Sequence, residues 1–482
     1  MSTDRFADRR AALLAQLGET IAIIPAGRAQ TRNDDVPHPF RQDSDFYFLT
    51  GFSEPDAVAV FDATSDKPYT LFVRPRDPQS EAWSGRRAGV GGAISRFGAD
   101  AALELDELDA WLRRRLAGRR SVGYTLGGRL DEAVLEAMRA VRTYASRSGV
   151  DVPVELVDVG ALMAELRVIK SPAEIEALRE ACRISAVAHD EAMRFAGPGR
   201  TERQVQAVLE YVFGVMDAER VGYESIVAGG DNACILHYVE NDAVLADGDL
   251  LLIDAAAEYR HLTSDITRTF PVNGRFSMPQ RAIYEVVLRA QRAVIAECRP
   301  GLAWTRMHER SVEVLAEGMV ALGLLPGPVD EVIAKGWYRQ FFFHGTGHWL
   351  GIDVHDAGRS RFGSEGRPLE PGMAFTVEPG IYVAREKATV TLSHAVYDPD
   401  ERVRLAFELG RAGARAEIER RDADAGTFEY EVPAEYLGIG VRIEDDLLIT
   451  PEGYENLSGS SPVEPDAVEA RCAEGSDLPL FR

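Results

Sequence analysis

The chain has 482 residues, of which 45% are hydrophobic and 27% charged, a balance typical of a folded globular protein with a sizeable core. This length exceeds that of a typical single domain, so two domains are expected. The formal net charge of −23 argues against a surface for nucleic acid or anionic lipid, and we expect neither a nucleic acid nor a membrane as partner.

Residues 1–168 are predicted to form an N-terminal α/β domain, because helix-period stretches alternate with short apolar strands. The expected helices cover 6–17, 101–116 and 131–143, and the expected strands cover 22–25, 57–61 and 70–73. Residues 1–18 have no signal-peptide pattern, and no apolar run reaches the length of a membrane span. Four widely spaced cysteines without a CxxC pair favour reduced thiols, so the expected location is cytoplasmic.

The domain boundary is expected just before a long helix that starts at Pro172. Ser171 supplies an N-cap, Pro172 fits the first helical position, and Glu174 completes a capping box. Residues 169–482 therefore form the second domain. Its expected helices cover 172–195, 201–218, 279–298 and 304–322.

Five residues of metal-ligand type lie in this second domain, and most of them fall on or beside apolar strands. They are Asp254, Asp265, His348, Glu378 and Glu444. Asp254 ends the run LLLID, the segment TSDITRTFPV is predicted as a strand that carries Asp265, and the segments 373–378 and 439–450 are predicted as strands that carry the two glutamates. Four carboxylates and one imidazole are too many anionic ligands for one ion, so two divalent cations with bridging carboxylates are predicted, an arrangement suited to metal-assisted hydrolysis.

Other polar residues accompany these ligands. Arg442 lies two residues before Glu444 on the same predicted strand, where it can orient a ligand carboxylate. His344 shares the glycine-flanked loop FFFHGTGHWLG with His348, while His237 and His355 lie in ILHYVEN and GIDVHDAG. Such histidines can bind the scissile carbonyl, its oxyanion or the leaving group. The remaining histidines are interpreted as structural.

Several blocks of sequence resemble the pita-bread metallopeptidases, and within them the Xaa-Pro aminopeptidases (aminopeptidase P). The first part of the chain contributes FRQDSDFYFLTGFSEPDA (40–57) and EAWSGRR (81–87). The second part contributes DGDLLLIDAAAEY, SDITRTFPVNG, FFFHGTGHWLGIDVHD, LEPGMAFTVEPGIY and GIGVRIEDDLLIT. The resemblance implies an α+β protein in which a pita-bread catalytic domain follows an α/β domain.

The same resemblance implies roles for individual residues. Asp254 binds one metal through both oxygens, Asp265 and Glu444 bridge the two ions, and His348 and Glu378 complete the ligands of the second metal, with Glu378 also a proton shuttle. His237, His344 and His355 match substrate-contacting histidines, Arg442 matches an arginine that orients the ligands, and Tyr223 and Tyr382 match aromatic positions at the site. Trp83 matches a residue that reaches a neighbouring subunit's site in tetrameric relatives; an ordinary surface aromatic is the equal alternative.

The implied reaction releases the N-terminal residue from peptides with proline in second position, with two Mn²⁺ per subunit and Co²⁺ or Zn²⁺ as substitutes. A prolidase acting on Xaa-Pro dipeptides, or a non-catalytic peptide-binding module on the same fold, are the alternatives. A homo-oligomer, dimer or tetramer, is implied by resemblance alone. The segment 383–437 departs from the family pattern as an unusually long insertion, interpreted as a lid, an oligomer contact or an inert surface addition.

Overall fold

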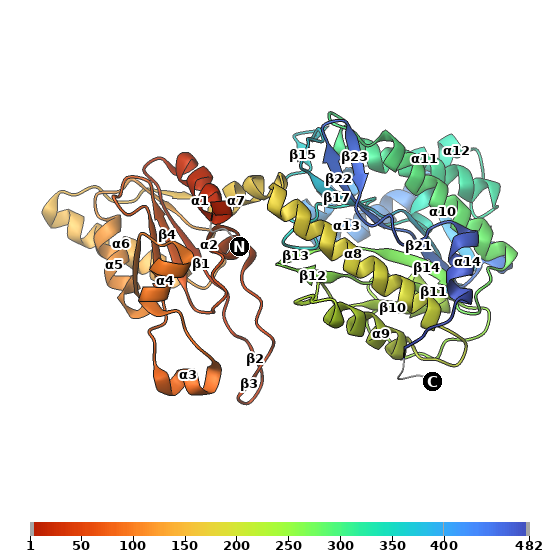
Figure 1. Cartoon of the computed structure of the whole chain (residues 1–482). Coiled ribbons are helices and arrows are strands. Elements are labelled where there is room, and N and C mark those ends of the chain that lie inside the picture. The colour runs from red at the N-terminus through yellow and green to blue at the C-terminus, as the bar shows by residue number, and fades with distance from the viewer. Residues whose placement is uncertain (1–3, 399, 479–482) are drawn as a thin grey trace. The chain divides into compact units, whose positions relative to one another are not determined.

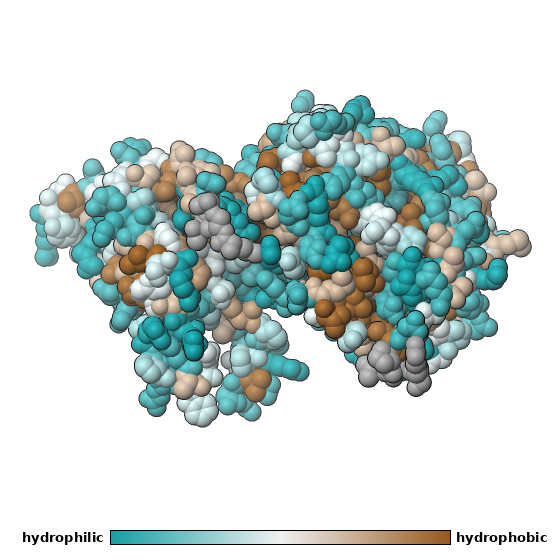
Figure 2. Space-filling model, viewed as in Figure 1, coloured by the Kyte–Doolittle hydropathy of each residue, from teal (hydrophilic) through white to brown (hydrophobic). Residues whose placement is uncertain are grey.

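The computed structural model describes residues 4–398 and 400–478, and the chain divides into two compact units, Met1–Arg167 and Val168–Arg482 (Figure 1). Across the described residues, no helix combines the length and apolar character needed to span a membrane. On the face drawn in Figure 2, hydrophilic side chains cover most of each unit, as the high content of charged residues requires.

The first unit contains a six-stranded sheet in the order β6-β5-β4-β1-β7-β8. Its strands are β1 (Ile21–Pro25), β4 (Val58–Asp62), β5 (Tyr69–Val73), β6 (Ala101–Glu104), β7 (Ser121–Gly123) and β8 (Glu155–Val157), and a separate small hairpin joins β2 (Thr31–Asn33) to β3 (Val36–Pro37). The central strands β1 and β4 pair antiparallel, whereas β1, β7 and β8 run parallel. Both faces of the central strands are buried, which explains their almost continuous apolar runs.

Helices surround this sheet. They are α1 (Asp4–Leu17), α2 (Ser44–Thr50), α3 (Pro78–Ser84), α4 (Gly89–Phe97), η1 (Leu105–Glu107), α5 (Leu108–Leu116), α6 (Asp131–Ser148) and α7 (Val159–Val168). The predicted helix 101–116 is wrong in its first four residues. Residues 101–104 form the edge strand β6, which pairs parallel with β5, so sheet pairing overrides the local preference for helix.

The second unit brings several short sheets around one cavity. The sheet β10-β11-β14 consists of β10 (Ile226–Gly229), β11 (Leu250–Asp254) and β14 (Thr267–Pro271), and a second sheet contains β17 (Ala374–Val377), β22 (Asp445–Thr450) and β23 (Gly453–Asn456). Strands β18 (Gly380–Val383) and β21 (Ile439–Arg442) form an antiparallel pair. An isolated bridge between Thr267 and Glu444 connects the first sheet with the chain between β21 and β22.

Long helices cover these strands (Figure 1). Apolar side chains of α8 (Pro172–Phe195) and α9 (Glu202–Val215) share a core with β10, β11 and β14. Those of α10 (Met278–Glu297) and α11 (Trp304–Ala321) share another core with β18 and β21. Shorter elements complete the unit: β9 (Arg220–Val221), η2 (Gly230–Cys234), β12 (Ala257–Tyr259), β13 (Leu262–Thr263), α12 (Val329–Ala334), η3 (Trp337–Gln340), β15 (Arg361–Phe362), β16 (Glu365–Gly366), η4 (Arg385–Lys387), η5 (Ala434–Tyr436) and α14 (Pro465–Ala473).

Two strand predictions need correction in detail. The predicted strand 439–450 is interrupted, so that Glu444 lies between β21 and β22 rather than inside a strand. Asp265 likewise precedes β14, because that strand begins only at Thr267. Both acidic residues therefore lie at strand ends, where the backbone can turn their side chains toward a shared cavity.

Residues 383–437 link β18 to β21 through a two-stranded ribbon and a helical segment. The ribbon pairs β19 (Thr389–Ser393) with β20 (Thr427–Glu431), and α13 (Glu401–Ala425) lies between these strands. Gly410, with φ 70° and ψ 166°, breaks α13, and Arg421 forms an ion pair with Glu401. Residues twenty apart would lie about 30 Å apart on one straight helix, so α13 is a helical hairpin that folds back at Gly410.

The start of α8 offers a test of the capping motif. The Ser171 backbone N–H and hydroxyl both donate to Glu174 Oε2, at 2.9 and 2.6 Å. Ser171→Ala should lower the free energy of unfolding by about 1 kcal/mol, because the helix loses its N-cap side chain. Urea unfolding followed by tryptophan fluorescence measures the change. Ser364→Ala, at an exposed turn position, is the control, and equal effects of both substitutions would contradict the capping role.

Candidate metal centre and active site

A cavity of about 340 Å³ in the second unit contains the polar residues singled out in the sequence. Its wall includes all five predicted ligands, the three predicted substrate-contacting histidines and the predicted orienting arginine. The lining residues are Leu236, His237, Asp254, Asp265, His344, Gly345, Gly347, His348, His355, Glu378, Arg442 and Glu444. Residues separated by up to about two hundred positions in the chain thus meet in one small space.

The ligand side chains come from the ends of different elements. Asp254 ends β11, Asp265 precedes β14, Glu378 follows β17, and Glu444 lies between β21 and β22. His348 lies on a loop fixed against β17, because the backbone N–H of Thr376 donates to its carbonyl oxygen at 3.0 Å. A β-carbon at Gly347 would lie 2.0 Å from the Thr376 carbonyl oxygen, so only glycine permits this close approach.

Side-chain atoms of three of the ligands converge closely. One ligand atom each from Asp265, His348 and Glu444 lies within 4.8 Å of the others. The His348 Nε2 atom lies 3.3 Å from Asp265 Oδ2 and 3.7 Å from Glu378 Oε1. Its Nδ1 atom lies 3.1 Å from the Trp349 carbonyl oxygen, which fixes the ring with Nε2 directed at the carboxylates. That orientation is the one a metal-binding histidine requires.

Burial concentrates negative charge in this cavity. Burial, and then the charges of Asp265 and Glu378, raise the pKa of Glu444 well above its usual range. Burial also raises the pKa of Glu378 to about 7 and raises the pKa of Asp254, although Arg442 opposes the shift at Asp254. A buried carboxylate without a compensating charge is strongly unfavourable. The set therefore fits a site for divalent cations.

The chemistry of the donors indicates which cations fit. Four carboxylates and one imidazole provide mostly hard oxygen ligands, suited to ions such as Mn²⁺. Tyr223 lies at the same place, since its hydroxyl is 2.5 Å from both Asp254 Oδ1 and Asp265 Oδ1. A hydroxyl has one proton to donate, so it satisfies only one of the two carboxylates at a time. The remaining negative charge is left for bound cations.

Arg442 connects the ligands with the polar residues around them. Its Nη2 atom donates to Asp254 Oδ2 at 2.6 Å, and its Nε atom donates to Thr267 Oγ1 at 3.0 Å. The Thr267 hydroxyl in turn donates to Glu444 Oε2 at 2.7 Å. Arg442 thus fixes one ligand directly and another through Thr267, a residue that sequence reasoning did not single out.

A chain of hydrogen bonds leads from Arg442 to His344. The Arg442 Nη1 atom donates to the Tyr382 hydroxyl at 3.1 Å, and that hydroxyl lies 2.9 Å from His344 Nε2. His344 Nδ1 lies 2.7 Å from the Gly345 carbonyl oxygen, so Nδ1 carries the proton and Nε2 accepts from Tyr382. Burial, and then the charge of Arg442, lower the pKa of His344 to about 3. This imidazole is therefore neutral at physiological pH.

The other predicted residues differ in their surroundings. His237 and His355 are exposed residues on the cavity wall, and the rings of His355 and His348 are 4.2 Å apart in an edge-to-face arrangement. Burial and the neighbouring His348 lower the pKa of His355. Trp83 belongs to the first unit, on α3, and is 89% exposed.

The structure also shows polar partners that the sequence gave no reason to select. Lys170 and Asp356 form a buried ion pair of 2.7 Å beside the loop that carries His355. Asp445 and Asp446, next to Glu444, are buried behind the cavity. Glu219, Glu258 and His261 form a separate acidic group, but Arg220 contacts Glu258 and neutralises part of its charge. Buried lysine and aspartate are rare without partners, but the burial of Lys170 and Asp356 is visible only in the structure.

Comparison with protein families identifies the chain. Residues 176–451 match the model of metallopeptidase family M24, and residues 6–123 match the aminopeptidase P N-terminal domain. The chain belongs to metallopeptidase family M24. It is therefore a metal-dependent peptidase, and the resemblance to aminopeptidase P drawn from the sequence is confirmed.

Individual relatives of this M24 peptidase match along nearly its whole length. The Xaa-Pro aminopeptidase of Escherichia coli is 39% identical over 476 residues, which cover 98% of each chain. Human Xaa-Pro aminopeptidase 3 is 33% identical over 92% of this chain and 79% of its own. The structure of Pseudomonas aeruginosa aminopeptidase PepP superposes with a TM-score of 0.87 at 43% identity and covers 98% of each chain. A zinc-substituted E. coli aminopeptidase P in complex with product superposes with a TM-score of 0.86 at 38% identity, covering 98% of this chain and 99% of its own.

The charge balance of the cavity predicts how the metal-free M24 peptidase responds to pH. Burial alone would lower the pKa of His348, but the hydrogen bond and charge of Asp265, with Glu378, raise it to about 9. The unfolded histidine loses its proton near about pH 6.5. Between about pH 7 and 9 the folded state therefore holds more protons than the unfolded state, and its stability should fall as pH rises.

Thermal unfolding of chelator-treated protein across this pH range measures the effect. His348→Gln has no proton to lose, so the difference in melting temperature between pH 7 and pH 9, about the two ends of this window, should shrink in the variant. Added Mn²⁺ should stabilise the wild type, since an ion that binds only the folded state raises its stability. Identical pH profiles of wild type and variant would contradict this account of the cavity.

Proposed function

We propose that this peptidase releases the N-terminal residue from peptides that carry proline in the second position. The observation that carries the proposal is the cavity with its five convergent ligands and three histidines. The names of the matched relatives support the substrate class, since the E. coli and human relatives are both Xaa-Pro aminopeptidases. Proline requires a dedicated enzyme because its peptide nitrogen is tertiary and its φ is fixed.

We further propose two Mn²⁺ per chain, held by Asp254, Asp265, His348, Glu378 and Glu444. Oxygen-rich ligation with a single histidine favours Mn²⁺, and Co²⁺ or Zn²⁺ would suit the same donors. When bound, two divalent cations supply Lewis-acid polarisation of the scissile carbonyl and an activated water nucleophile. Four cysteines, all free, support a reducing cytoplasmic location.

The residues of the chain orient the substrate and move its proton. His237, His344 and His355 line the cavity, where they can bind the scissile carbonyl, its developing oxyanion and the leaving group. Arg442 keeps Asp254 in place and, through Tyr382, presents a neutral His344 as a hydrogen-bonding group. Glu378, whose pKa is raised to about 7, can transfer a proton to the leaving prolyl nitrogen.

Two alternatives share the same cavity. A prolidase would cleave only Xaa-Pro dipeptides, and the match of residues 6–123 to the aminopeptidase P N-terminal domain favours the aminopeptidase. A non-catalytic peptide-binding module would be expected to have lost one or more ligands, whereas all five line this cavity.

The proposal is tested with Mn²⁺-loaded protein on Xaa-Pro-Xaa tripeptides, Xaa-Pro dipeptides and Xaa-Ala-Xaa controls. We expect cleavage of the first class at the Xaa-Pro bond. Glu378→Ala should lower turnover by at least about 10²–10⁴-fold, because the proton transfer disappears and the metal site loses one ligand. Glu386→Ala removes an exposed carboxylate outside the cavity and should leave turnover unchanged. Cleavage of dipeptides alone would make the protein a prolidase, and cleavage of neither would refute both.

We also propose that residues 1–168 are the aminopeptidase P-type domain and that residues 169–482 form the catalytic domain.

We propose further that the insertion 383–437 contributes to a homo-oligomer. The α13 hairpin exposes the side chains of Val403 (71%), Phe407 (89%) and Leu409 (51%). Its six arginines balance its six acidic residues, whereas the whole chain carries a net charge of −23. Two copies repel each other least where their surfaces are neutral, and exposed aromatic and arginine side chains are typical of interfaces. These features favour a second copy of this chain as the partner.

Light scattering on eluting protein tests the oligomer. The wild type should exceed the 52.9 kDa of one chain, and the double variant Val403→Ser, Phe407→Ser should shift toward it. Met278→Ser is the matched control, because Met278 is also 89% exposed but lies on α10. A wild-type mass of one chain would refute the interface. A lid would instead show itself as a changed preference for peptide length at unchanged mass.

An oligomer would also give Trp83 a role. This residue is 89% exposed within its own chain, so it is available to a partner. If it reaches the cavity of a neighbouring subunit to contact substrate, Trp83→Ala lowers turnover while Mn²⁺ affinity stays unchanged. An ordinary surface tryptophan would change neither.

A further inference from the structure

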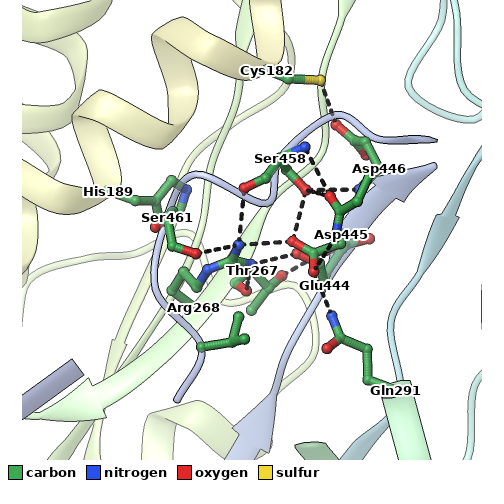
Figure 3. Close-up of polar contacts among 12 residues, drawn as sticks. Cys182, His189, Thr267, Arg268, Gln291, Glu444, Asp445, Asp446, Ser458 and Ser461 are labelled. Atoms are coloured by element: carbon green, nitrogen blue, oxygen red, sulfur yellow. Dashed lines mark hydrogen bonds and ion pairs between the residues drawn. The ribbon is translucent and has the colours of Figure 1, made fainter. Parts of the chain in front are cut away.

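Behind the metal-binding cavity lies a buried polar cluster that the proposed reaction does not use. Figure 3 shows its centre, where the side chain of Arg268 from β14 lies between the chain at Glu444–Asp446 and the loop at Ser458–Ser461. Arg268 is among the largest fully buried side chains of the protein. A guanidinium in such a place is strongly unfavourable unless its donors are satisfied, so its partners indicate what it does.

Arg268 binds both chain segments that deliver the predicted bridging ligands. Its Nη1 atom donates to the carbonyl oxygen of Glu444 at 2.6 Å and to that of Thr267, two residues after Asp265, at 3.0 Å. One planar group therefore joins the start of β14 to the break between β21 and β22. The loop that follows β23 is held as well, since Nη2 donates to the carbonyl oxygens of Ser458 and Ser461 at 3.3 and 3.2 Å.

Asp445 supplies the counter-charge and is hydrogen-bonded at both oxygens. Its Oδ1 atom accepts from Arg268 Nη2 and from the Ser458 hydroxyl, each at 2.7 Å. Its Oδ2 atom accepts from Gln291 Nε2 and Asn456 Nδ2, each at 3.0 Å. Hydrogen bonds to both Asp445 oxygens and to both terminal nitrogens of Arg268 thus fix the geometry of this ion pair, whereas Arg268 Nε has no partner among the described residues (Figure 3).

Asp446 extends the same cluster to the other bridging ligand. Its Oδ2 atom accepts from the backbone N–H of Asp265 at 2.9 Å and from the Cys182 thiol at 3.1 Å. Consecutive acidic residues thus have different tasks. Glu444 faces the cavity, Asp445 binds the Arg268 side chain that donates to the Glu444 carbonyl oxygen, and Asp446 binds the backbone N–H of Asp265.

We propose that Arg268 and Asp445 form a positioning pair that sets the distance between Glu444 and Asp265 and thereby tunes the affinity of the cavity for divalent cations. The pair touches neither substrate nor ion. It acts through the backbone of the ligands, where a displacement of about 0.5 Å is enough to disturb a preorganised site. The inference rests on the metal site of the proposed function and on no step of the peptidase reaction.

Arg268→Lys provides the sharpest test. Lysine keeps the positive charge but offers a compact ammonium in place of a planar fork, so it cannot reach the Glu444 and Thr267 carbonyls and Asp445 together. We expect Mn²⁺ titration of the metal-free variant by calorimetry to show binding weakened about 10–100-fold, the range found when partners of metal ligands are removed. Unchanged affinity in a folded variant would overturn the proposal.

Two further variants separate positioning from general destabilisation. Met319→Ala removes a fully buried apolar side chain of α11 that takes no part in the hydrogen bonds around Arg268; it should lower the melting temperature while Mn²⁺ affinity stays at the wild-type value. Gln291→Met removes only one donor to Asp445 and keeps the volume, so it tests the pair even if Arg268→Lys does not fold. It should weaken Mn²⁺ binding several-fold, and an affinity equal to that of the wild type would count against the proposal.

The readout also separates this inference from the proposed function. Weakened Mn²⁺ binding in Arg268→Lys together with a wild type that cleaves no Xaa-Pro peptide would leave the positioning pair in place and refute the substrate class. Cleavage of Xaa-Pro peptides by the wild type, with unchanged Mn²⁺ affinity in both variants, would support the substrate class and refute the positioning pair.

Discussion

The burial of four carboxylates in one small cavity is the constraint around which the catalytic unit is organised. Burial and the neighbouring carboxylates raise the pKa values of Asp254, Glu378 and Glu444, whereas the hydrogen bond from His348 lowers that of Asp265. Without bound cations the arrangement is electrostatically unfavourable. Stability has to come from the rest of the unit, whose helices and strands bury extensive apolar cores on both sides of the site. The fold therefore holds together carboxylates that repel one another.

Two arginines, Arg442 and Arg268, stabilise the acidic cavity from different sides. Arg442 lies at the cavity wall and binds the side chain of Asp254, whereas Arg268 lies behind it and binds backbone carbonyl oxygens. The first compensates charge where ions and substrate meet, and the second defines where the ligand-bearing strands end. Both are fully buried and paired, which is the condition under which arginine is tolerated in a protein interior.

The unit builds its site almost entirely from strand ends and loops. Asp254 pairs with Thr267 across β11 and β14, and Thr267 forms an isolated bridge to Glu444. The ends of these neighbouring strands therefore meet at one cavity. Regular strands would point alternate side chains to opposite faces, but the breaks at Asp265 and Glu444 let both side chains face the cavity. The 383–437 insertion leaves from the β18–β21 pair beside this site, yet its own helical hairpin exposes apolar side chains to solvent.

Much of the site was accessible from the sequence, because acidic residues at the ends of apolar runs are costly to bury without a partner, and glycines around His344 and His348 indicate a tight-turned loop. The five predicted ligands all line one cavity, and propensity and capping placed helix 172–195 at its observed bounds. Local patterns failed where distant pairing decides: residues 101–104 became a strand because β5 offered an edge, and the break at Glu444 depends on its bridge to Thr267. Which residues stand behind the ligands, Arg268, Asp445 and Asp446 among them, was decided by tertiary structure alone, because hydrogen bonds between residues nearly two hundred positions apart leave no mark in local sequence.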